Sequence, residues 1–325
     1  MQMQYKTLGR TGIQVSQLCF GTMSFGSRAD VQESQNMYSM CRDMGINFFD
    51  CANVYQKGVA ETYLGSFIAS ERNKVVITTK AHMPMSEDVN DRGCSAKNLR
   101  LSLEASLKRL KTDYVDVFFL HAFDPNTAEE LMLRTLDQLV RDGKILSIGV
   151  SNYAAYQVER LLRISDRMGF SPVQVIQPMY NIAKRQAEVE LLPMAKAEGL
   201  GVVTYSPLGG GLLSGRYKDG ITKAKGRLVE NEKYTMRYSG EFYEHLASQF
   251  SLLAEALGIE EAPLALSWVM ANPLVTSPII GAANTQQLKQ TLRATTVEMT
   301  KDILAGIEKI SPSPPPAHDR SEEQR

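Results

Sequence analysis

Eight short apolar runs alternate with longer segments of helical spacing, and this alternation constrains the fold more than any other feature of the chain. Their length and composition are typical of buried strands. The runs cover residues 18–20, 46–49, 75–79, 115–120, 145–150, 173–177, 202–205 and 276–280. The segments between them place apolar side chains on one helical face, as with Leu99, Leu103, Leu107 and Leu110 and with Met132, Leu136, Leu139 and Val140. Eight strands alternating with helices fit a closed (β/α)8 TIM barrel, although the strand count alone also allows an open doubly wound sheet.

The glycine pattern separates these two folds. An open dinucleotide-binding sheet is expected to carry Gly-x-Gly-x-x-Gly directly after its first strand. Residues 21–26 read Gly-Thr-Met-Ser-Phe-Gly, which lacks that pattern. We therefore predict one α/β domain over residues 1–310, a TIM barrel preceded by a β-hairpin over residues 6–15 that turns at residues 10–12.

Polar residues of three chemical types stand where successive apolar runs end. Asp50, Lys80 and His121 each follow such a run, and Tyr55 lies in the turn after Asp50. Because the carboxyl ends of parallel strands gather at one rim, we expect these four side chains to meet there. Taken alone, Asp50 is more typical of a helix cap and His121 of a hydrogen-bonded strand end. Only the combination of all four predicts a catalytic site.

The chemistry of this group follows from the side-chain types. A phenol has a pKa near ~10 and donates a proton readily only if a neighbour stabilises its phenolate. An ammonium at ~4 Å contributes about 4 kcal/mol at an effective dielectric of ~20, so Lys80 can lower the pKa of Tyr55, while burial opposes it. Asp50 would keep Lys80 charged, and His121 would donate to a substrate oxygen. The four residues predict a carbonyl that is protonated as hydride arrives, which requires a nicotinamide or a flavin.

Composition excludes several classes of partner. Thirty-six basic and 36 acidic residues leave no net charge, so we predict neither nucleic acid nor an anionic membrane surface as a partner. The absence of an apolar run of about 18 residues and the polar start of the chain predict no membrane insertion and no signal peptide. Four cysteines without metal-ligand spacing suit reduced thiols in a cytoplasmic protein, and no metal site is predicted.

Residues 311–325 have little apolar surface to bury and are predicted to form a disordered tail.

Longer motifs give a resemblance to a known family. They are Cys19-Phe-Gly-Thr-Met23, Phe49-Asp-Cys-Ala-Asn-Val-Tyr55, Thr78-Thr-Lys80, Val115-Asp-Val-Phe-Phe-Leu-His121, Gly143-Lys-Ile-Leu-Ser-Ile-Gly-Val-Ser-Asn152 and Tyr205-Ser-Pro-Leu208. With them the chain resembles the aldo-keto reductases. Two further stretches, residues 205–217 and 281–287, make it most similar to bacterial members and to those like the potassium-channel beta subunits. The resemblance implies a hairpin that closes the bottom of the barrel. It also implies that the glycine-rich segment after the seventh strand, residues 208–243, covers the cofactor.

The same resemblance implies a set of cofactor contacts. Ser151, Asn152 and Gln177 would bond the nicotinamide carboxamide, and Tyr205 would stack on the ring. The full set is Gly21, Thr22, Met23, Asp50, Ser151, Asn152, Gln177, Tyr205, Ser206, Leu208, Gly210, Arg216, Arg227, Gly281, Ala283 and Gln287. Residues 281–291 include Lys289 but no basic residue where a 2′-phosphate clamp is often found; Gln287, Arg216 and Arg227 can serve instead. NADP(H) is therefore favoured, and NAD(H) stays open.

The predicted function is interconversion of a small-molecule carbonyl compound and its alcohol, with Tyr55 as general acid and base. A second hypothesis is a nucleotide-binding, redox-sensing subunit of a channel-like partner with slow or no turnover. A third takes Lys80 as a Schiff-base lysine in a barrel aldolase. The substrate is not readable from the loops, and a homo-oligomer is as compatible with the sequence as a monomer.

Overall fold

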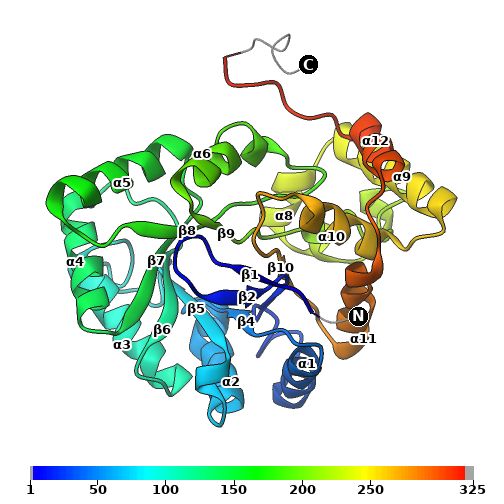
Figure 1. The fold of residues 1–325 in the computed structure, drawn as a ribbon. Coiled ribbons are helices and arrows are strands. Elements are labelled where there is room, and N and C mark those ends of the chain that lie inside the picture. The colour runs from blue at the N-terminus through cyan, green and yellow to red at the C-terminus, as the bar shows by residue number, and fades with distance from the viewer. Residues whose placement is uncertain (1–2, 319–325) are drawn as a thin grey trace.

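The computed structural model describes residues 3–318, and its centre is a barrel of eight parallel strands (Figure 1). The strands are β3 (Cys19–Gly21), β4 (Phe48–Asp50), β5 (Val76–Ala81), β6 (Val115–Leu120), β7 (Ile145–Ser151), β8 (Val173–Gln177), β9 (Gly201–Val202) and β10 (Ile279–Ile280). Each pairs with its neighbour in parallel, in the order β10-β3-β4-β5-β6-β7-β8-β9. The ring is closed where the Ile279 N–H donates to the Thr204 carbonyl at 2.7 Å. The predicted barrel is confirmed.

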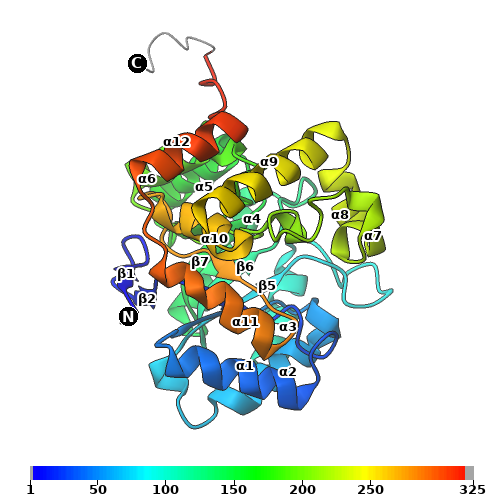
Figure 2. The ribbon, with the colours of Figure 1, turned by 90° about the vertical axis from the view of Figure 1, so that its right-hand side faces the viewer.

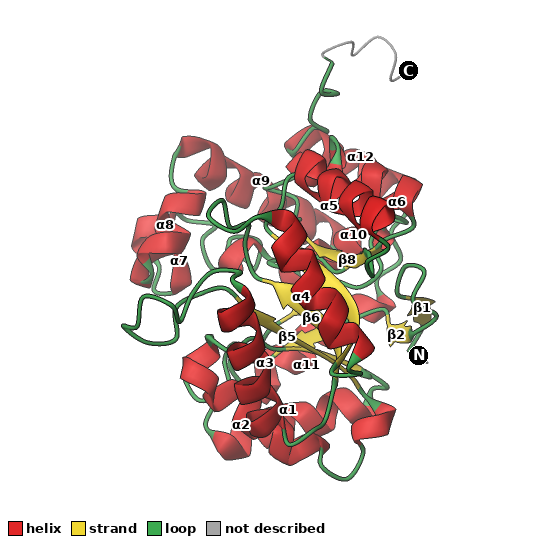
Figure 3. Ribbon diagram, turned by 90° about the vertical axis from the view of Figure 1, so that its left-hand side faces the viewer, coloured by secondary structure: helices red, strands yellow, loops and turns green. Residues whose placement is uncertain are grey.

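Helices surround the strands on the outside (Figure 3). They are α1 (Val31–Asp43), α2 (Val59–Ile68), α3 (Ala96–Leu110), α4 (Glu129–Arg141), α5 (Ala155–Met168), α6 (Leu191–Glu198), α9 (Glu241–Leu257), α10 (Glu261–Ala271), α11 (Thr285–Leu292) and α12 (Lys301–Ile310). The predicted leucine face of α3 is buried, and on α4 Met132, Leu136 and Leu139 are buried while Val140 is partly so. α1 and α3 begin at side-chain caps, where Asp30 accepts from the Glu33 N–H and Ser95 from the Asn98 N–H.

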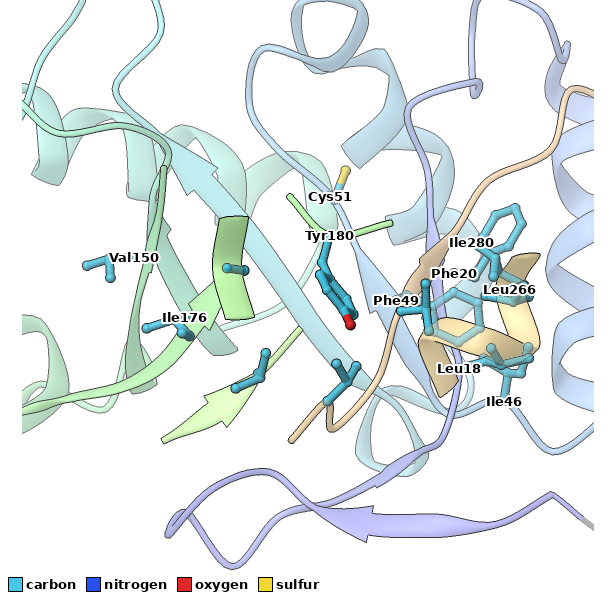
Figure 4. Close-up of a cluster of buried hydrophobic side chains, with 14 of the residues drawn as sticks. Leu18, Phe20, Ile46, Phe49, Cys51, Val150, Ile176, Tyr180, Leu266 and Ile280 are labelled. Carbon is cyan, nitrogen blue, oxygen red and sulfur yellow. The ribbon is translucent and has the colours of Figure 1, made fainter. Parts of the chain in front are cut away.

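The two-residue period of the strands sorts their side chains between two cores. Phe20, Phe49 and Ile77 point outward and pack against the helices, so that Leu266 of α10 lies beside Phe20 and Ile280 (Figure 4). Alternate residues point inward and fill the barrel: they include Phe48, Val76, Val117, Phe119 and Val175. An inward residue at the end of a strand therefore faces the mouth of the barrel.

The hairpin formed by β1 (Tyr5–Thr7) and β2 (Gln14–Ser16) closes one end of the barrel (Figure 1). Leu8 and Val15 are buried in the inner core, and Ser16 exchanges hydrogen bonds with Asn47 just before β4 begins. Gly9 is required here, because its φ is +56° and a Cβ would lie 2.4 Å from the Gly201 nitrogen. The hairpin thus covers the amino ends of the strands, as predicted, and leaves the carboxyl ends for the site.

The segment between β9 and α9 lies at the opposite end of the barrel from the hairpin (Figure 2). It is not a plain loop: it contains η4 (Gly209–Gly211), η5 (Ile221–Lys223), α7 (Arg227–Glu230) and α8 (Glu232–Tyr238). Tyr238 at the end of α8 is buried, and its hydroxyl accepts a hydrogen bond from Asn181 Nδ2 at 3.2 Å. This contact anchors the segment to the loop after β8.

Ordered contacts continue past the predicted domain boundary at residue 310. Arg185 donates from Nη2 to Ser313 Oγ at 2.6 Å and also contacts the Ser311 carbonyl. Of the predicted disordered tail, residues 319–325 lie outside the described residues, so the prediction for them stays a prediction. Between residues 3 and 318, no helix has both the length and the apolar character needed to cross a membrane.

Candidate active site

The inward parity of the strands delivers three of the four predicted catalytic residues to the carboxyl rim. Asp50 is the last residue of β4 and pairs in register with Gly21 and Thr78. Lys80 lies near the end of β5, two residues after Thr78 and so on the same inner face. His121 follows β6 with the same parity as Phe119. The predicted meeting of these side chains at one rim is what the geometry of the barrel produces.

Lys80 contacts both Asp50 and Tyr55 and so connects this group. Its side chain is fully buried, and Nζ donates to Asp50 Oδ2 at 2.6 Å, to the Cys51 carbonyl at 2.7 Å and to Tyr55 Oη at 3.3 Å. The other oxygen of Asp50, Oδ1, accepts from Thr78 Oγ1 at 2.7 Å and from Gln177 Nε2 at 3.0 Å. A buried carboxylate and a buried ammonium persist only when paired and hydrogen-bonded, and both conditions hold here.

Tyr55 reaches Lys80 from an unusual turn. It begins η1 (Tyr55–Gly58), in which Gln56 and Lys57 both have left-handed backbones, with φ of 47° and 50°. Non-glycine residues adopt this conformation rarely, and it needs support from the surroundings. The turn brings the phenol back over the end of β5, where it is only partly exposed.

Burial has the largest effect on the acidity of this group. It raises the pKa of Tyr55 to about 12, although the positive charge of Lys80 acts in the opposite direction. The sequence predicts that Lys80 lowers this pKa, and in this site its effect is smaller than that of burial. Burial also lowers the pKa of Lys80, but Asp50 and Tyr55 outweigh it and leave that pKa above its usual value. The raised pKa values favour a protonated Tyr55 phenol and a charged Lys80, which disfavours a Schiff-base lysine because such a lysine reacts as the neutral amine.

His121 lies beside the phenol as a neutral ring. The ring centres of Tyr55 and His121 are 6.2 Å apart at an interplanar angle of 78°. Burial, together with the charges of Lys80 and His82, lowers the pKa of His121 to about 3. Its Nδ1 is buried, and among residues 3–318 it has no hydrogen-bond partner. A neutral imidazole can present one N–H to a ligand oxygen.

A cavity of about 660 Å³ opens above these residues. It is lined by Tyr55, His121 and most of the predicted cofactor residues: Gly21, Met23, Asp50, Ser151, Asn152, Gln177, Tyr205, Ser206, Leu208, Gly210, Arg216, Arg227, Gly281, Ala283 and Gln287. Thr22 is different, because it is fully buried and its hydroxyl donates to the Asp50 carbonyl at 3.0 Å. Thr22 therefore contacts the end of β4 and does not line the cavity. A volume of this size suits a large organic ligand.

The residues predicted to hold a carboxamide form one hydrogen-bonded chain. Tyr205 Oη donates to Asn152 Oδ1 at 2.7 Å, and Asn152 Nδ2 donates to the His121 carbonyl at 2.9 Å and to Ser151 Oγ at 3.1 Å. Ser151 Oγ in turn donates to the Gln177 carbonyl at 2.9 Å. Asn152 has a φ of 60°, a conformation that asparagine tolerates better than most residues. The chain links the Tyr205 ring to the backbone of His121.

Positive charge is concentrated on the cavity wall of a protein that has no net charge. Arg28, Arg216, Arg227, Lys233 and Arg237 all line it. The Arg227 and Arg237 guanidinium groups lie 5.0 and 5.4 Å from the centre of the Tyr234 ring, and Arg28 pairs with Glu230 of α7 at 3.7 Å. Sequence reasoning missed Arg28, Lys233 and Arg237. The four-residue spacing of the last two was the available signal, because it places them on one face of α8.

Comparison with known proteins agrees with this geometry. The model of the Aldo/keto reductase family matches residues 17–312. The chain belongs to the aldo/keto reductase family. It is 37% identical to the uncharacterized oxidoreductase YrpG of Bacillus subtilis (strain 168), over 96% of this chain and 97% of that protein. It is 36% identical to a probable voltage-gated potassium channel subunit beta of Arabidopsis thaliana, over 96% and 98%, and 32% identical to norsolorinic acid reductase A of Aspergillus parasiticus, over 93% and 79%. Family membership supports oxidoreductase activity.

Aldo/keto reductases generally bind nicotinamide cofactors, and the residues of this cavity fit such a group. The cations of the wall complement a pyrophosphate, and the Asn152 and Gln177 side chains can bond an amide. At the far side of the cavity, the Ala283 N–H donates to Gln287 Oε1 at 3.0 Å and Asn284 caps α11. The described residues 3–318 contain no cluster of three or more histidine, cysteine, aspartate or glutamate residues arranged to hold a metal ion.

Proposed function

We propose that this aldo/keto reductase is an NADP(H)-dependent enzyme that interconverts small aldehydes or ketones with their alcohols, with Tyr55 as the general acid and base. One observation carries the proposal. A fully buried lysine contacts both a buried aspartate, at 2.6 Å, and a tyrosine hydroxyl, at 3.3 Å, and that tyrosine lines a cavity of about 660 Å³. This is the arrangement that a proton donor to a carbonyl oxygen requires.

Each residue then has a distinct role. When bound, the reduced nicotinamide supplies hydride to the carbonyl carbon. Tyr55 gives its phenolic proton to the carbonyl oxygen, and the Lys80 ammonium stabilises the phenolate that remains. Asp50 keeps Lys80 charged and in place through their 2.6 Å contact. His121 is neutral and donates an N–H to the same oxygen, which orients the carbonyl toward Tyr55.

The proposed preference for NADP(H) rests on charge. Arg216 and Arg227 line the cavity from the segment after β9, and Gln287 lines it from α11. A 2′-phosphate adds about two negative charges to the nucleotide, so guanidinium groups in this cavity favour it over NAD(H). Gln290 also lines the cavity, but its Nε2 already donates to Glu260 Oε2 at 2.7 Å.

A second candidate function is a nucleotide-binding, redox-sensing subunit that turns over slowly or not at all. The similarity to the Arabidopsis protein named as a probable potassium channel beta subunit favours keeping it. The two candidate functions differ in what they require of Tyr55. A catalyst needs its proton in every cycle, whereas a binding subunit needs only the cavity around it.

The test measures NADPH and NADH oxidation by the purified protein with a panel of aldehydes, ketones and sugars, and repeats it with Tyr55→Phe. We expect the wild type to reduce part of the panel faster with NADPH. We expect Tyr55→Phe to bind NADPH within about twofold of the wild type and to lose at least 99% of turnover, because general acid catalysis contributes about 10²- to 10⁴-fold. Near-normal turnover by Tyr55→Phe would overturn the assignment. Tight binding without turnover by the wild type would favour the redox-sensing subunit.

A further inference from the structure

A buried ion pair lies directly behind the catalytic lysine, on the outer side of β5. Along this strand Thr78 and Lys80 point inward and both contact Asp50, so Thr79 between them points outward. The Thr79 hydroxyl donates to Glu61 Oε1, and the carboxylate of Glu61 is completely buried. This contact connects α2 to the strand residue next to Lys80.

The second oxygen of Glu61 binds α3. Arg109 Nε donates to Glu61 Oε2 at 2.6 Å, and Arg109 Nη2 donates to Ser106 Oγ at 3.3 Å. The side chain of Arg109 is 24% exposed and that of Glu61 is not exposed at all. A buried carboxylate is retained only when such a partner compensates for its lost hydration, so the pair locks β5, α2 and α3 together.

The same arginine also lies against the turn that carries Tyr55. Gly58 ends that turn with a φ of +93°, and a Cβ there would lie 2.6 Å from Arg109 Cδ and 2.7 Å from Nε. Gln56 and Lys57 before it are both left-handed, a conformation that persists only where its surroundings enforce it. One face of the Arg109 side chain therefore supports the Gly58 backbone, while its Nε bonds Glu61.

We infer that Glu61 and Arg109 are positioning residues that hold Tyr55 at hydrogen-bond distance from Lys80. Both partners of the 3.3 Å contact between Tyr55 Oη and Lys80 Nζ depend on them, Lys80 through Thr79 and Tyr55 through Gly58. Neither residue lines the cavity or touches the reacting groups. The inference rests on the proposed function only for the consequence that displacing Tyr55 slows reduction.

The test replaces the pair by neutral side chains of similar length in Glu61→Gln/Arg109→Gln. We expect kcat to fall at least tenfold, because Tyr55 is displaced, and the Kd for NADPH to stay within twofold, because the other cavity residues keep their positions. The matched control is Asp116→Asn, which removes the carboxylate charge of the similar pair of Asp116 with Arg72, at 2.8 Å, near the start of β6. That variant should lower Tm while kcat stays within twofold of the wild type.

A second readout does not need turnover. In protein labelled with ¹³Cζ tyrosine, the Tyr55 NMR signal is assigned by its loss in Tyr55→Phe. We expect that signal and its titration midpoint to move in the double variant and to stay unchanged in Asp116→Asn. If the double variant fails to fold, Arg109→Lys keeps a positive charge beside Glu61 but removes the planar guanidinium, whose Nε and Cζ would lie 2.7 and 3.1 Å from a Cβ at Gly58, and it should shift the same signal.

The outcomes separate the two proposals. A folded double variant with wild-type kcat and an unchanged Tyr55 titration overturns the positioning role. A wild type that reduces nothing on the panel overturns the proposed reductase, and the Tyr55 titration still decides whether Glu61 and Arg109 position the phenol.

Discussion

Replacement of Lys80 by methionine tests the proposed catalytic centre most directly. The change keeps an unbranched side chain and removes the ammonium that lies 3.3 Å from Tyr55 Oη. At that distance and an effective dielectric of ~20, a unit charge stabilises the phenolate by about 5 kcal/mol, equivalent to between three and four units of pKa. Burial already raises the pKa of Tyr55 to about 12, so the variant lacks the interaction that opposes burial.

The expected loss of rate follows from how much phenolate charge has developed in the transition state. If about half has developed, the lost attraction is about 2.5 kcal/mol, and the lost hydrogen bond from a charged donor adds about 1.5–3 kcal/mol. We therefore expect kcat to fall by about 10³- to 10⁴-fold, at 1.4 kcal/mol for each factor of ten. The Kd for NADPH should change by less than threefold, because Lys80 does not line the cavity.

The same variant also leaves Asp50 buried without its cation. Breaking a buried pair in this way destabilises a fold by about 3–5 kcal/mol, and the hydrogen bonds from Thr78 and Gln177 compensate only in part. The double variant Lys80→Met/Asp50→Asn removes the buried charge as well. We expect it to recover Tm but not kcat, which separates loss of fold from loss of chemistry.

The assay follows NADPH oxidation with the best carbonyl substrate of the panel, alongside thermal unfolding of each variant. Lys74→Met is the matched control, since it makes the same substitution at an exposed lysine of η2 (Arg72–Lys74) and should leave kcat unchanged. A folded Lys80→Met/Asp50→Asn variant with kcat within threefold of the wild type would refute the electrostatic role of Lys80.

Three further predictions concern the cavity. Tyr205→Phe keeps the ring but loses the 2.7 Å hydrogen bond to Asn152, so fluorescence titration should show about three- to tenfold weaker NADPH binding, and an unchanged Kd would contradict the role of that hydroxyl. Arg216→Ala should raise the Kd for NADPH about ten- to a hundredfold and that for NADH by less than threefold, whereas equal losses would argue against a 2′-phosphate contact. Burial depresses the pKa of His121 from 6.5 to about 3, so its contribution to stability is complete above pH 6.5 and is lost as pH falls toward 3. The stability of His121→Gln should accordingly fall less than that of the wild type between pH 7 and pH 5, and parallel losses would contradict this.

Much of the barrel can be predicted from short stretches of the sequence. Strand periodicity is a short-range property, so the eight apolar runs and the parity of their last residues could be predicted without any knowledge of packing. The predicted run over residues 115–120 coincides with β6, and that over residues 173–177 with β8. The convergence of Asp50, Lys80 and His121 on one rim follows from the same two-residue period once the sheet closes.

Features of the site that depend on contacts between residues far apart in the chain became visible only in the structure. The left-handed backbone of Gln56 and Lys57 was not predicted, because such a conformation depends on its surroundings, and here Arg109 of a distant helix lies against the neighbouring Gly58. Whether Lys80 or burial sets the acidity of Tyr55 depends on how much protein surrounds the phenol, which no motif records. The cations of α8 line the cavity, and that helix ends at Tyr238, which is hydrogen-bonded to Asn181, a residue distant in sequence.

The sequence by itself therefore determined a barrel and the residues at its rim, because strand periodicity acts over a few residues. Only the tertiary structure decided the protonation of those residues, the shape of the turn that presents Tyr55 and the positive wall of the cavity. These properties depend on burial and on contacts between segments distant in sequence, such as Glu61 with Arg109, and they exist only when the chain has closed around them.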